Sequence, residues 1–213
     1  MKIQVISLFP EMLPGVLNQS MLFKAQDKKL VEFEYVNLRD YGLGKRKTVD
    51  DTPYGGGDGM LLKPEPLVAA IEAAKAKSKN AKVILMTPRG KLYKQSDAKR
   101  LASADQDYIF VCARYEGYDE RVTNFVDEQI SIGSFVVTGG ELPAMIVIDS
   151  IVRLIPGVLG GETSAENESF QDDDTTLEAP QYTRPEVFRG QKVPKVLLSG
   201  NHADIAKWRE TKK

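Results

Sequence analysis

Two charged residues interrupt the long apolar run at residues 142–160, and they are the first candidates for chemistry in this chain. Asp149 and Arg153 are four residues apart, so on a helix they share one face, with the acid ahead of the base. A charge among apolar side chains is costly unless it is paired or used. Two interpretations stay open, a structural ion pair and a functional arginine, and the residues alone favour the ion pair.

The same run predicts a helix whose apolar side chains need other parts of the structure packed against every face. Gly139 and Gly140 form a turn that opens into residues 142–155, which are apolar nearly all round. A helix that is apolar on every side must be covered on every side. A second subunit is the simplest cover, so we expect a homodimer.

Three segments break at the ends of successive predicted strands, and they define a candidate ligand site. They are residues 88–90, 113–117 and 132–140. In open α/β sheets, ligands bind outside the carboxyl ends of the strands. We therefore predict that a cofactor lies against these three segments.

The elements that must position these segments alternate between strand and helix. Such alternation is typical of an α/β domain in which helices cover a mostly parallel sheet. The predicted strands are residues 2–9, 31–38, 82–87, 108–113, 129–132 and 135–138. The predicted helices are residues 10–19, 66–78, 95–104 and 118–125, in addition to the apolar helix.

Residues 39–63 form a long loop rich in glycine and charge, and loops of this length are usually functional. The run from Tyr54 to Met60 contains four glycines. Its backbone amides could cradle a phosphate. A flexible loop that covers the substrate is the preferred interpretation, because the run lacks the lysine of a nucleotide-binding loop.

Composition excludes several chemistries. Cys112 is the only cysteine and His202 the only histidine, which rules out an intrachain disulfide and a zinc cluster built from several Cys and His ligands. Cys112 is expected in the core. The N-terminus reads as a strand and not as a signal peptide, and the apolar helix is too short to span a bilayer. We expect a cytoplasmic protein without a membrane segment.

Charge is distributed unevenly although the net charge is only −1. Residues 161–178 hold seven acids and no base, and residues 184–213 hold eight bases and three acids. The predicted organisation is a cofactor-binding domain at 1–160, an acidic linker at 161–177 and a small basic unit at 178–213. Charge alone favours a solvated surface, yet local basic patches also suit RNA.

Seven runs in register identify a resemblance over residues 1 to about 209. The chain resembles the bacterial tRNA (guanine-N1)-methyltransferases, members of the S-adenosylmethionine-dependent SPOUT superfamily. The runs are residues 8–12 (LFPEM), 49–60 (VDDTPYGGGDGM), 114–121 (RYEGYDER), 138–144 (TGGELPA), 153–160 (RLIPGVLG), 182–185 (YTRP) and 199–202 (SGNH).

The resemblance implies a fold, a cofactor and a partner. The fold would carry a deep trefoil knot at the C-terminal end of the first domain, and the last unit would be small, mainly helical and shorter than usual. The methyl donor would be S-adenosylmethionine, bound by an obligate homodimer. The residues implied to hold it are Met86, Thr87, Pro88, Ala113, Tyr115, Glu116, Gly117, Ile132, Gly133, Ser134, Phe135, Val136, Val137, Gly139, Gly140 and Pro143.

The resemblance also assigns catalysis and the RNA partner. The target would be N1 of the guanine at position 37 in the tRNA anticodon arm. Glu168 maps to the family base, where Asp is usual, and Arg153 maps to the family arginine; Asp172 is the nearest substitute for the base. Ala113 replaces the usual Gly. The residues implied to contact RNA are Lys45, Arg46, Asp50, Arg184, Asn201 and His202.

Three questions stay open at this point. No metal site is expected within the chain, while a Mg²⁺ dependence of the reaction is left for experiment. One alternative function is a non-catalytic RNA-binding dimer. Another is a SPOUT methyltransferase that acts on a different RNA.

Overall fold

The computed structural model describes residues 1–160, 168–171 and 173–212. The chain divides into two compact units, residues 1–160 and residues 161–213, and each is described by itself. Of the linker predicted at residues 161–177, residues 161–167 and 172 lie outside the described residues.

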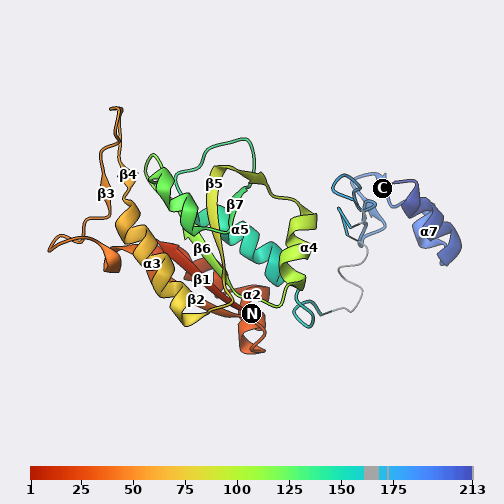
Figure 1. The fold of residues 1–213 in the computed structure, drawn as a ribbon. Coiled ribbons are helices and arrows are strands. Elements are labelled where there is room, and N and C mark those ends of the chain that lie inside the picture. The colour runs from red at the N-terminus through yellow and green to blue at the C-terminus, as the bar shows by residue number, and fades with distance from the viewer. Residues whose placement is uncertain (161–167, 172, 213) are drawn as a thin grey trace. The chain divides into compact units, whose positions relative to one another are not determined.

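A five-stranded parallel sheet forms the centre of the first unit (Figure 1). Its strand order is β2-β1-β6-β5-β7, and all four neighbouring pairs are parallel. The strands are β1 (Lys2–Ser7), β2 (Glu32–Asn37), β5 (Lys82–Leu92), β6 (Tyr108–Cys112) and β7 (Glu128–Ser131). The predicted α/β class and its parallel sheet are confirmed.

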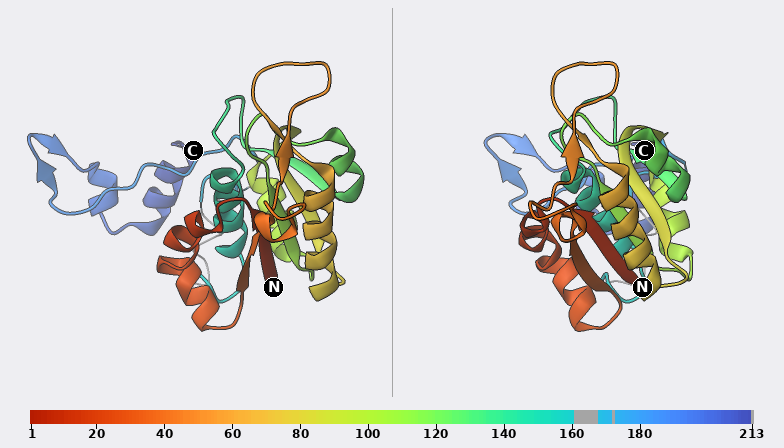
Figure 2. Two further views of the ribbon diagram at one scale, coloured as in Figure 1. Left: turned by 90° about the vertical axis from the view of Figure 1, so that its left-hand side faces the viewer. Right: turned by 60° about the vertical axis from the view of Figure 1, so that its left-hand side comes forward.

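Helices cover both faces of this sheet (Figure 2). Alternate residues of each strand point to opposite faces, so Val83 and Leu85 enter one core and Ile84 and Met86 the other. Helix α3 (Pro64–Lys77) covers the first face. The other face is covered by α1 (Pro14–Leu17), α2 (Ser20–Asp27), α4 (Gln95–Ser103) and α5 (Glu141–Val152).

Prolines explain two differences between predicted and observed helices. The predicted helix at residues 10–19 is instead a 3₁₀ turn, Pro10–Met12, followed by α1. Pro14 has no N–H to continue the first turn, but it is well suited to begin a new one. Helix α3 begins two residues earlier than predicted because Pro64 and Pro66 fit its first turn.

Two predictions about strands are wrong. Strand β5 does not end at Thr87 but continues through Pro88 to Leu92. Its pairing with β7 shifts register between Met86 and Lys91, and a bulge of this kind is where a strand tolerates proline. Residues 135–138 form a loop, not a strand, because no strand of the described chain pairs with them.

The long loop contains a small hairpin. Strand β3 (Asp50–Asp51) pairs antiparallel with β4 (Leu61–Leu62), and the connection at residues 52–60 projects from the body of the unit (Figure 2). Two 3₁₀ turns frame this region, at Leu38–Tyr41 and Glu120–Phe125. The second lies within the helix predicted at residues 118–125, and Asp119 caps it by accepting from the N–H of Arg121.

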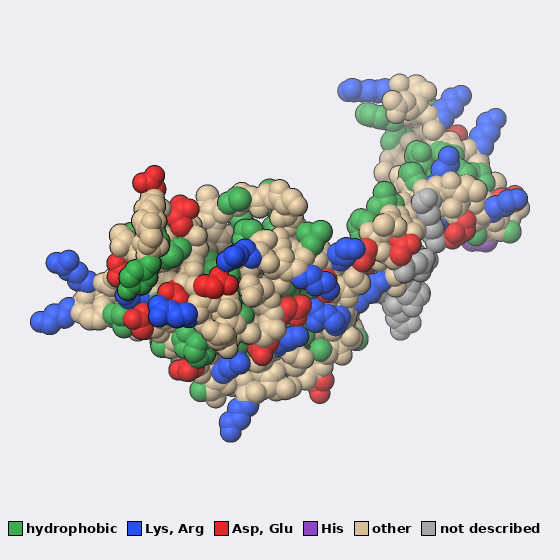
Figure 3. Space-filling view, turned by 45° about the horizontal axis from the view of Figure 1, so that its top comes forward, with side chains coloured by type: hydrophobic (Ala, Val, Ile, Leu, Met, Phe, Trp, Pro, Cys, Tyr) green, Lys and Arg blue, Asp and Glu red, His purple; other side chains and the backbone are tan. Residues whose placement is uncertain are grey.

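Where the structure describes it, the second unit combines a hairpin with two helices. Its elements are β8 (Val187–Phe188), β9 (Gln191–Lys192), α6 (Lys195–Leu198) and α7 (His202–Glu210). The rings of Tyr182 and Trp208 lie 6.4 Å apart between centroids. Lys and Arg side chains project from its surface (Figure 3). None of the helices in the described parts of either unit is long and apolar enough to cross a membrane.

Candidate functional site

A pocket opens at the carboxyl ends of β6 and β7, beside the bulge in β5. Its walls come from the bulge in β5, from the residues after β6, and from the segment between β7 and α5. All residues predicted to hold the cofactor line this pocket except Ser134. Ile130 and Ser131 line it as well and were not predicted, whereas Arg114 and Thr138 belong to the predicted segments 113–117 and 132–140 without having been named as cofactor residues.

The start of α5 packs directly against the end of β6. The N–H of Gly140 donates to the carbonyl of Ala113 at 2.8 Å. A Cβ on Gly140 would lie 2.7 Å from Cα of Cys112 and 2.9 Å from the backbone N of Ala113. Only glycine fits here without a backbone shift, so the floor of the pocket depends on Gly140.

An ion pair between the half-buried Arg114 and the buried Glu141 holds the start of α5 in place. The Nε of Arg114 lies 2.9 Å from a carboxylate oxygen of Glu141, which is 1% exposed. The hydroxyl of Ser7 donates to the second oxygen at 2.6 Å, and the Arg114 guanidinium stacks 4.7 Å from the Phe9 ring centroid. Because the half-buried Arg114 side chain is both paired with Glu141 and stacked on Phe9, we interpret it as a clamp on the turn at residues 138–141.

The rim of the pocket carries unusual backbone conformations. Tyr115 adopts φ 60° and Gly117 adopts φ 122°, and this bend closes on itself through a bridge between Arg114 and Gly117. The bend turns Tyr115 and the carboxylate of Glu116 outward at the mouth, where both are exposed. Cys112, just before the bend, is fully buried, and burial raises the pKa of its thiol; the structure confirms it as a core residue.

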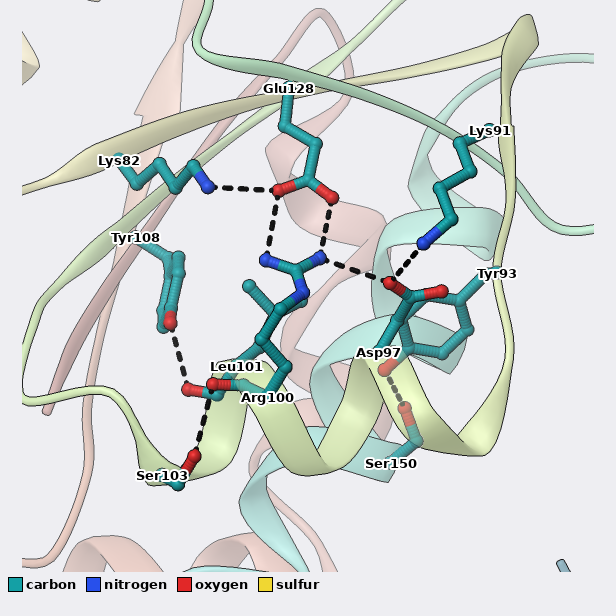
Figure 4. Close-up of polar contacts among 10 residues, drawn as sticks. All are labelled: Lys82, Lys91, Tyr93, Asp97, Arg100, Leu101, Ser103, Tyr108, Glu128 and Ser150. Carbon is teal, nitrogen blue, oxygen red and sulfur yellow. Dashed lines mark hydrogen bonds and ion pairs between the residues drawn. The ribbon is translucent and has the colours of Figure 1, made fainter. Parts of the chain in front are cut away.

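A network of charged side chains anchors the far side of the β5 bulge (Figure 4). Asp97 of α4 accepts from Lys91 at 2.8 Å and from Arg100 at 3.1 Å, and Arg100 reaches Glu128 of β7 at 2.6 Å. Burial would raise the pKa of Asp97, but the hydrogen bonds from Lys91 and Arg100 outweigh it and hold that pKa below the ordinary value.

The β5 bulge connects this charged network to the pocket, because it runs from Met86, which lines the pocket, to Lys91, which belongs to the network. A Cβ on Gly90 would lie 2.4 Å from the backbone N of Ile130, so the bulge runs tightly against β7. Tyr93 follows it, and its hydroxyl lies 2.7 Å from the Ser150 hydroxyl of α5. Asp97 thus holds Lys91, and Ser150 holds Tyr93, at the C-terminal end of the bulge. Thr87 and Pro88, at its other end, line the pocket.

Within one chain the apolar helix α5 is covered on only part of its surface, and the homodimer expected to cover the rest stays a prediction. Leu142 and Ile146 are 49% and 54% exposed, and Asp149 is exposed on the same strip. Arg153, the C-cap of α5, is half-buried rather than fully enclosed. Leu142, Ile146, Asp149 and Arg153 follow the i, i+4, i+7, i+11 spacing of one helix face, and we call this face the exposed strip of α5. The other faces of the helix pack into the core.

The remaining predicted residues lie on exposed segments. Lys45 and Arg46 occupy the turn closed by a bridge between Leu43 and Thr48, and Asp50 begins β3. Asn201 caps α7 by accepting from the N–H groups of Ala203 and Asp204, while Arg184 and His202 are exposed in the second unit.

The predicted catalytic pair is divided between the units. Glu168 belongs to the second unit and Arg153 to the first, and the structure describes each only within its own unit. Asp172 lies outside the described residues. Among the described residues, no group of three His, Cys, Asp or Glu could hold a metal ion.

The fold and the pocket together define an α/β protein with a pocket at the edge of the sheet where its parallel strands end, the place where such sheets bind ligands. Comparison with known proteins identifies the family to which this α/β protein belongs. The chain belongs to the family described as tRNA (Guanine-1)-methyltransferase TrmD, whose model matches residues 1–213.

Its relatives are identical to it at about half of the aligned positions. A protein of Citrifermentans bemidjiense is 54% identical over 210 residues, covering 98% of this chain and 83% of its own length. Relatives in Staphylococcus carnosus and Brevibacillus brevis are 54% and 55% identical, covering 100% and 98% of this chain and 86% and 85% of their own lengths. All three carry the name tRNA (guanine-N(1)-)-methyltransferase.

Proposed function

We propose that this protein transfers a methyl group from S-adenosylmethionine to N1 of the guanine at position 37 of tRNA. The observation that carries this proposal is the pocket itself. Three segments distant in sequence, predicted from strand ends and from the family resemblance, meet around one hollow. The names of the relatives support the reaction class and the target atom.

The chemistry of the pocket fits this cofactor. Apolar side chains such as Ile132, Phe135 and Pro143 suit an adenine ring, and backbone groups of the loops suit its polar edge. The Glu116 carboxylate at the rim suits a cationic group. When bound, the cofactor supplies a methyl group carried on a sulfonium.

Glu168 and Arg153 are the residues we assign to the reaction. N1 of guanine carries a proton, so it is a poor nucleophile until a base removes that proton. The Glu168 carboxylate would accept this proton. The Arg153 guanidinium would donate hydrogen bonds to O6, where negative charge develops as the proton leaves.

A homodimer would bring these residues together. The exposed apolar strip of Leu142 and Ile146 supports it, because a second copy of the chain would bury that strip. The segment from one subunit that carries Glu168 would then close over the cofactor of its partner. A trefoil knot is also part of the proposal, and it is supported by the return of Gly139 and Gly140 to the end of β6.

The tRNA would contact basic segments of both units. Lys45 and Arg46 are exposed in the first unit, and Arg184 and His202 in the second. Phosphate contacts by such residues position an RNA without reading its sequence. Asn201 is committed to its helix cap, so its role would be to hold His202 at the start of α7.

The experiment is methyl transfer from labelled S-adenosylmethionine to two tRNA transcripts that differ only at position 37. We expect transfer to the transcript with guanine and none to the transcript with adenine. Equal transfer to both would indicate a methyltransferase with another RNA target. Tight tRNA binding without transfer to either would indicate the non-catalytic RNA-binding alternative.

A further inference from the structure

One stretch of the pocket wall lacks strand partners. Strand β5 pairs with β6 only as far as Met86, and after that residue its pairing with β7 resumes only at Lys91. Within the described chain, residues 87–90 therefore have no ladder partner on either side, although Thr87 and Pro88 line the pocket. Backbone with few hydrogen bonds opens more easily than paired strand. The position of this wall therefore depends on side-chain contacts.

Thr87 is the residue through which side chains hold the bulge. It is 7% exposed, and its hydroxyl oxygen accepts from the N–H of Arg89 at 3.3 Å and from the hydroxyl of Tyr118 at 3.2 Å. The first hydrogen bond closes the bulge on itself, as threonine hydroxyls do in turns. The second joins the bulge to the segment that follows β6.

Tyr118 is itself held at its backbone and at its ring. Its backbone forms a bridge with Leu62, whose N–H donates to the carbonyl of Gly117 at 2.9 Å and whose carbonyl accepts from the N–H of Asp119 at 3.0 Å. Its ring packs against the core cluster on the α3 face of the sheet. The hydroxyl of Tyr118 therefore connects a firmly held residue to a bulge without strand partners.

An ion pair joins the same two segments two residues further on. Nη1 of Arg89 lies 2.9 Å from Oε2 of Glu120. Both side chains are largely exposed, and exposed ion pairs contribute little to stability. The hydrogen bond between Tyr118 and Thr87 is partly buried, so it is the stronger of the two connections.

We propose that Tyr118 is a positioning residue for the cofactor, because through Thr87 it fixes the separation between two walls of the pocket. One wall is the β5 bulge, and the other is the segment 113–117 directly before Tyr118. Tyr118 is not among the described residues that line the pocket. Walls that are held in place before binding need not be ordered when the cofactor binds, and this raises affinity. The inference rests on the proposed function for the identity of the cofactor.

Tyr118→Phe tests this connection, because it removes the hydroxyl and keeps the ring in the core. The loss of one ordinary hydrogen bond changes the ratio of held to released bulge by about 2- to 10-fold. The apparent affinity falls in proportion to the held fraction. We expect S-adenosylmethionine to bind Tyr118→Phe about 2- to 10-fold more weakly by calorimetry. The KM for the cofactor should rise by a similar factor, and kcat should change less, because bound cofactor restores the walls.

A double substitution tests whether Tyr118 acts through Thr87. Thr87→Val keeps the branched shape of the side chain but removes the acceptor, so it should weaken cofactor binding at least as much as Tyr118→Phe. In the Thr87→Val background, Tyr118→Phe should then have no further effect. Two independent and additive losses would overturn the proposal.

Tyr35→Phe is the matched control. The hydroxyl of Tyr35, in β2, also donates to a side-chain oxygen, Oδ1 of Asn18, at 3.0 Å, and Tyr35 is not among the described residues that line the pocket. The affinity for S-adenosylmethionine should stay unchanged in this variant. Equal weakening in Tyr35→Phe and Tyr118→Phe would mean that a general loss of stability is the cause, and it would overturn the proposal.

Amide hydrogen exchange of the chain without cofactor gives a second readout. Exchange at Thr87, Arg89 and Gly90 should be faster in Tyr118→Phe than in the unmodified chain or in Tyr35→Phe. Unchanged exchange at these residues would overturn the proposal.

The two readouts separate this proposal from the proposed function. If the unmodified chain bound no S-adenosylmethionine, the proposed function would fail, and exchange in the bulge would still support or overturn the connection to Tyr118. Methyl transfer to guanine 37 with equal cofactor affinity in Tyr118→Phe and the unmodified chain would support the proposed function and overturn the role of Tyr118.

Discussion

Gly140→Ala is the smallest substitution that tests whether the start of α5 forms the floor of a cofactor pocket. The added methyl would lie 2.7 Å from Cα of Cys112, whereas carbon atoms in contact normally lie about 3.5–4.0 Å apart. The start of α5 or the end of β6 must therefore move by about 1 Å. Both contribute residues to the pocket.

A displacement of about 1 Å in a binding site can cost on the order of 100-fold in rate. We expect S-adenosylmethionine to bind Gly140→Ala at least tenfold more weakly by calorimetry, and Gly140→Val not measurably. The strain should also cost about 1–3 kcal/mol of stability, as overpacking does. Thermal unfolding measures that cost separately.

Gly15→Ala is the matched control. Gly15 lies within α1, and a Cβ there would meet nothing within 4 Å. The substitution should leave cofactor binding unchanged and stabilise the protein slightly, because alanine favours a helix over glycine. Undiminished S-adenosylmethionine binding by Gly140→Val would refute this placement of the cofactor.

Three further predictions concern the base, the dimer and the charged network. Glu168→Gln should keep cofactor affinity but slow single-turnover methylation by about 10²–10⁴-fold, while Glu168→Asp should remain active; an unchanged rate in Glu168→Gln would place the base elsewhere. Ile146→Glu should release monomers or unfold the chain in sedimentation, and a compact monomer of the unmodified protein at micromolar concentration would contradict the dimer. Asp97→Asn should cost about 1–3 kcal/mol at pH 7 by urea unfolding, because Lys91 and Arg100 lose a shared acceptor. Since the folded-state pKa of Asp97 lies below 3.8, that stabilisation is present above this pH and is lost as the pH falls through the folded pKa, so the difference between the two proteins should shrink on acidification.

The pocket can be predicted from sequence because its signals are local. Apolar β-branched runs predict buried strands, and glycines or prolines directly after them predict turns at the strand ends. Parallel strands place those ends at one edge of the sheet. Thus the segments near Pro88, Ala113 and Gly133 can be grouped from the amino-acid sequence alone.

The contacts that hold the pocket together cannot be predicted in this way. Ser7 and Glu141 are 134 residues apart, and their hydrogen bond depends on β1 lying beside β6. Asp97 reads as one acid in a polar helix, and its burial depends on packing against the extended end of β5. Local patterning contains no information on such pairs.

Two errors share one physical cause. Pro88 predicts the end of a strand, yet β5 continues because the bulge removes the need for its N–H. Residues 135–138, Phe-Val-Val-Thr, have the β-branched and aromatic composition of a strand, yet they lie in a loop because a strand also needs a neighbour. Whether a segment forms a strand depends on whether it pairs with a neighbouring strand, and this pairing is set by the tertiary fold.

The most direct test of the central claim is the chemical position of the methyl group in the product. A tRNA transcript with guanine at position 37 is incubated with the full chain and S-adenosylmethionine, then digested and analysed by mass spectrometry. The proposed function predicts 1-methylguanosine in the fragment that contains position 37 and in no other fragment. A methyl group on another atom or at another position, or no methyl group under conditions where tRNA binds, would contradict it.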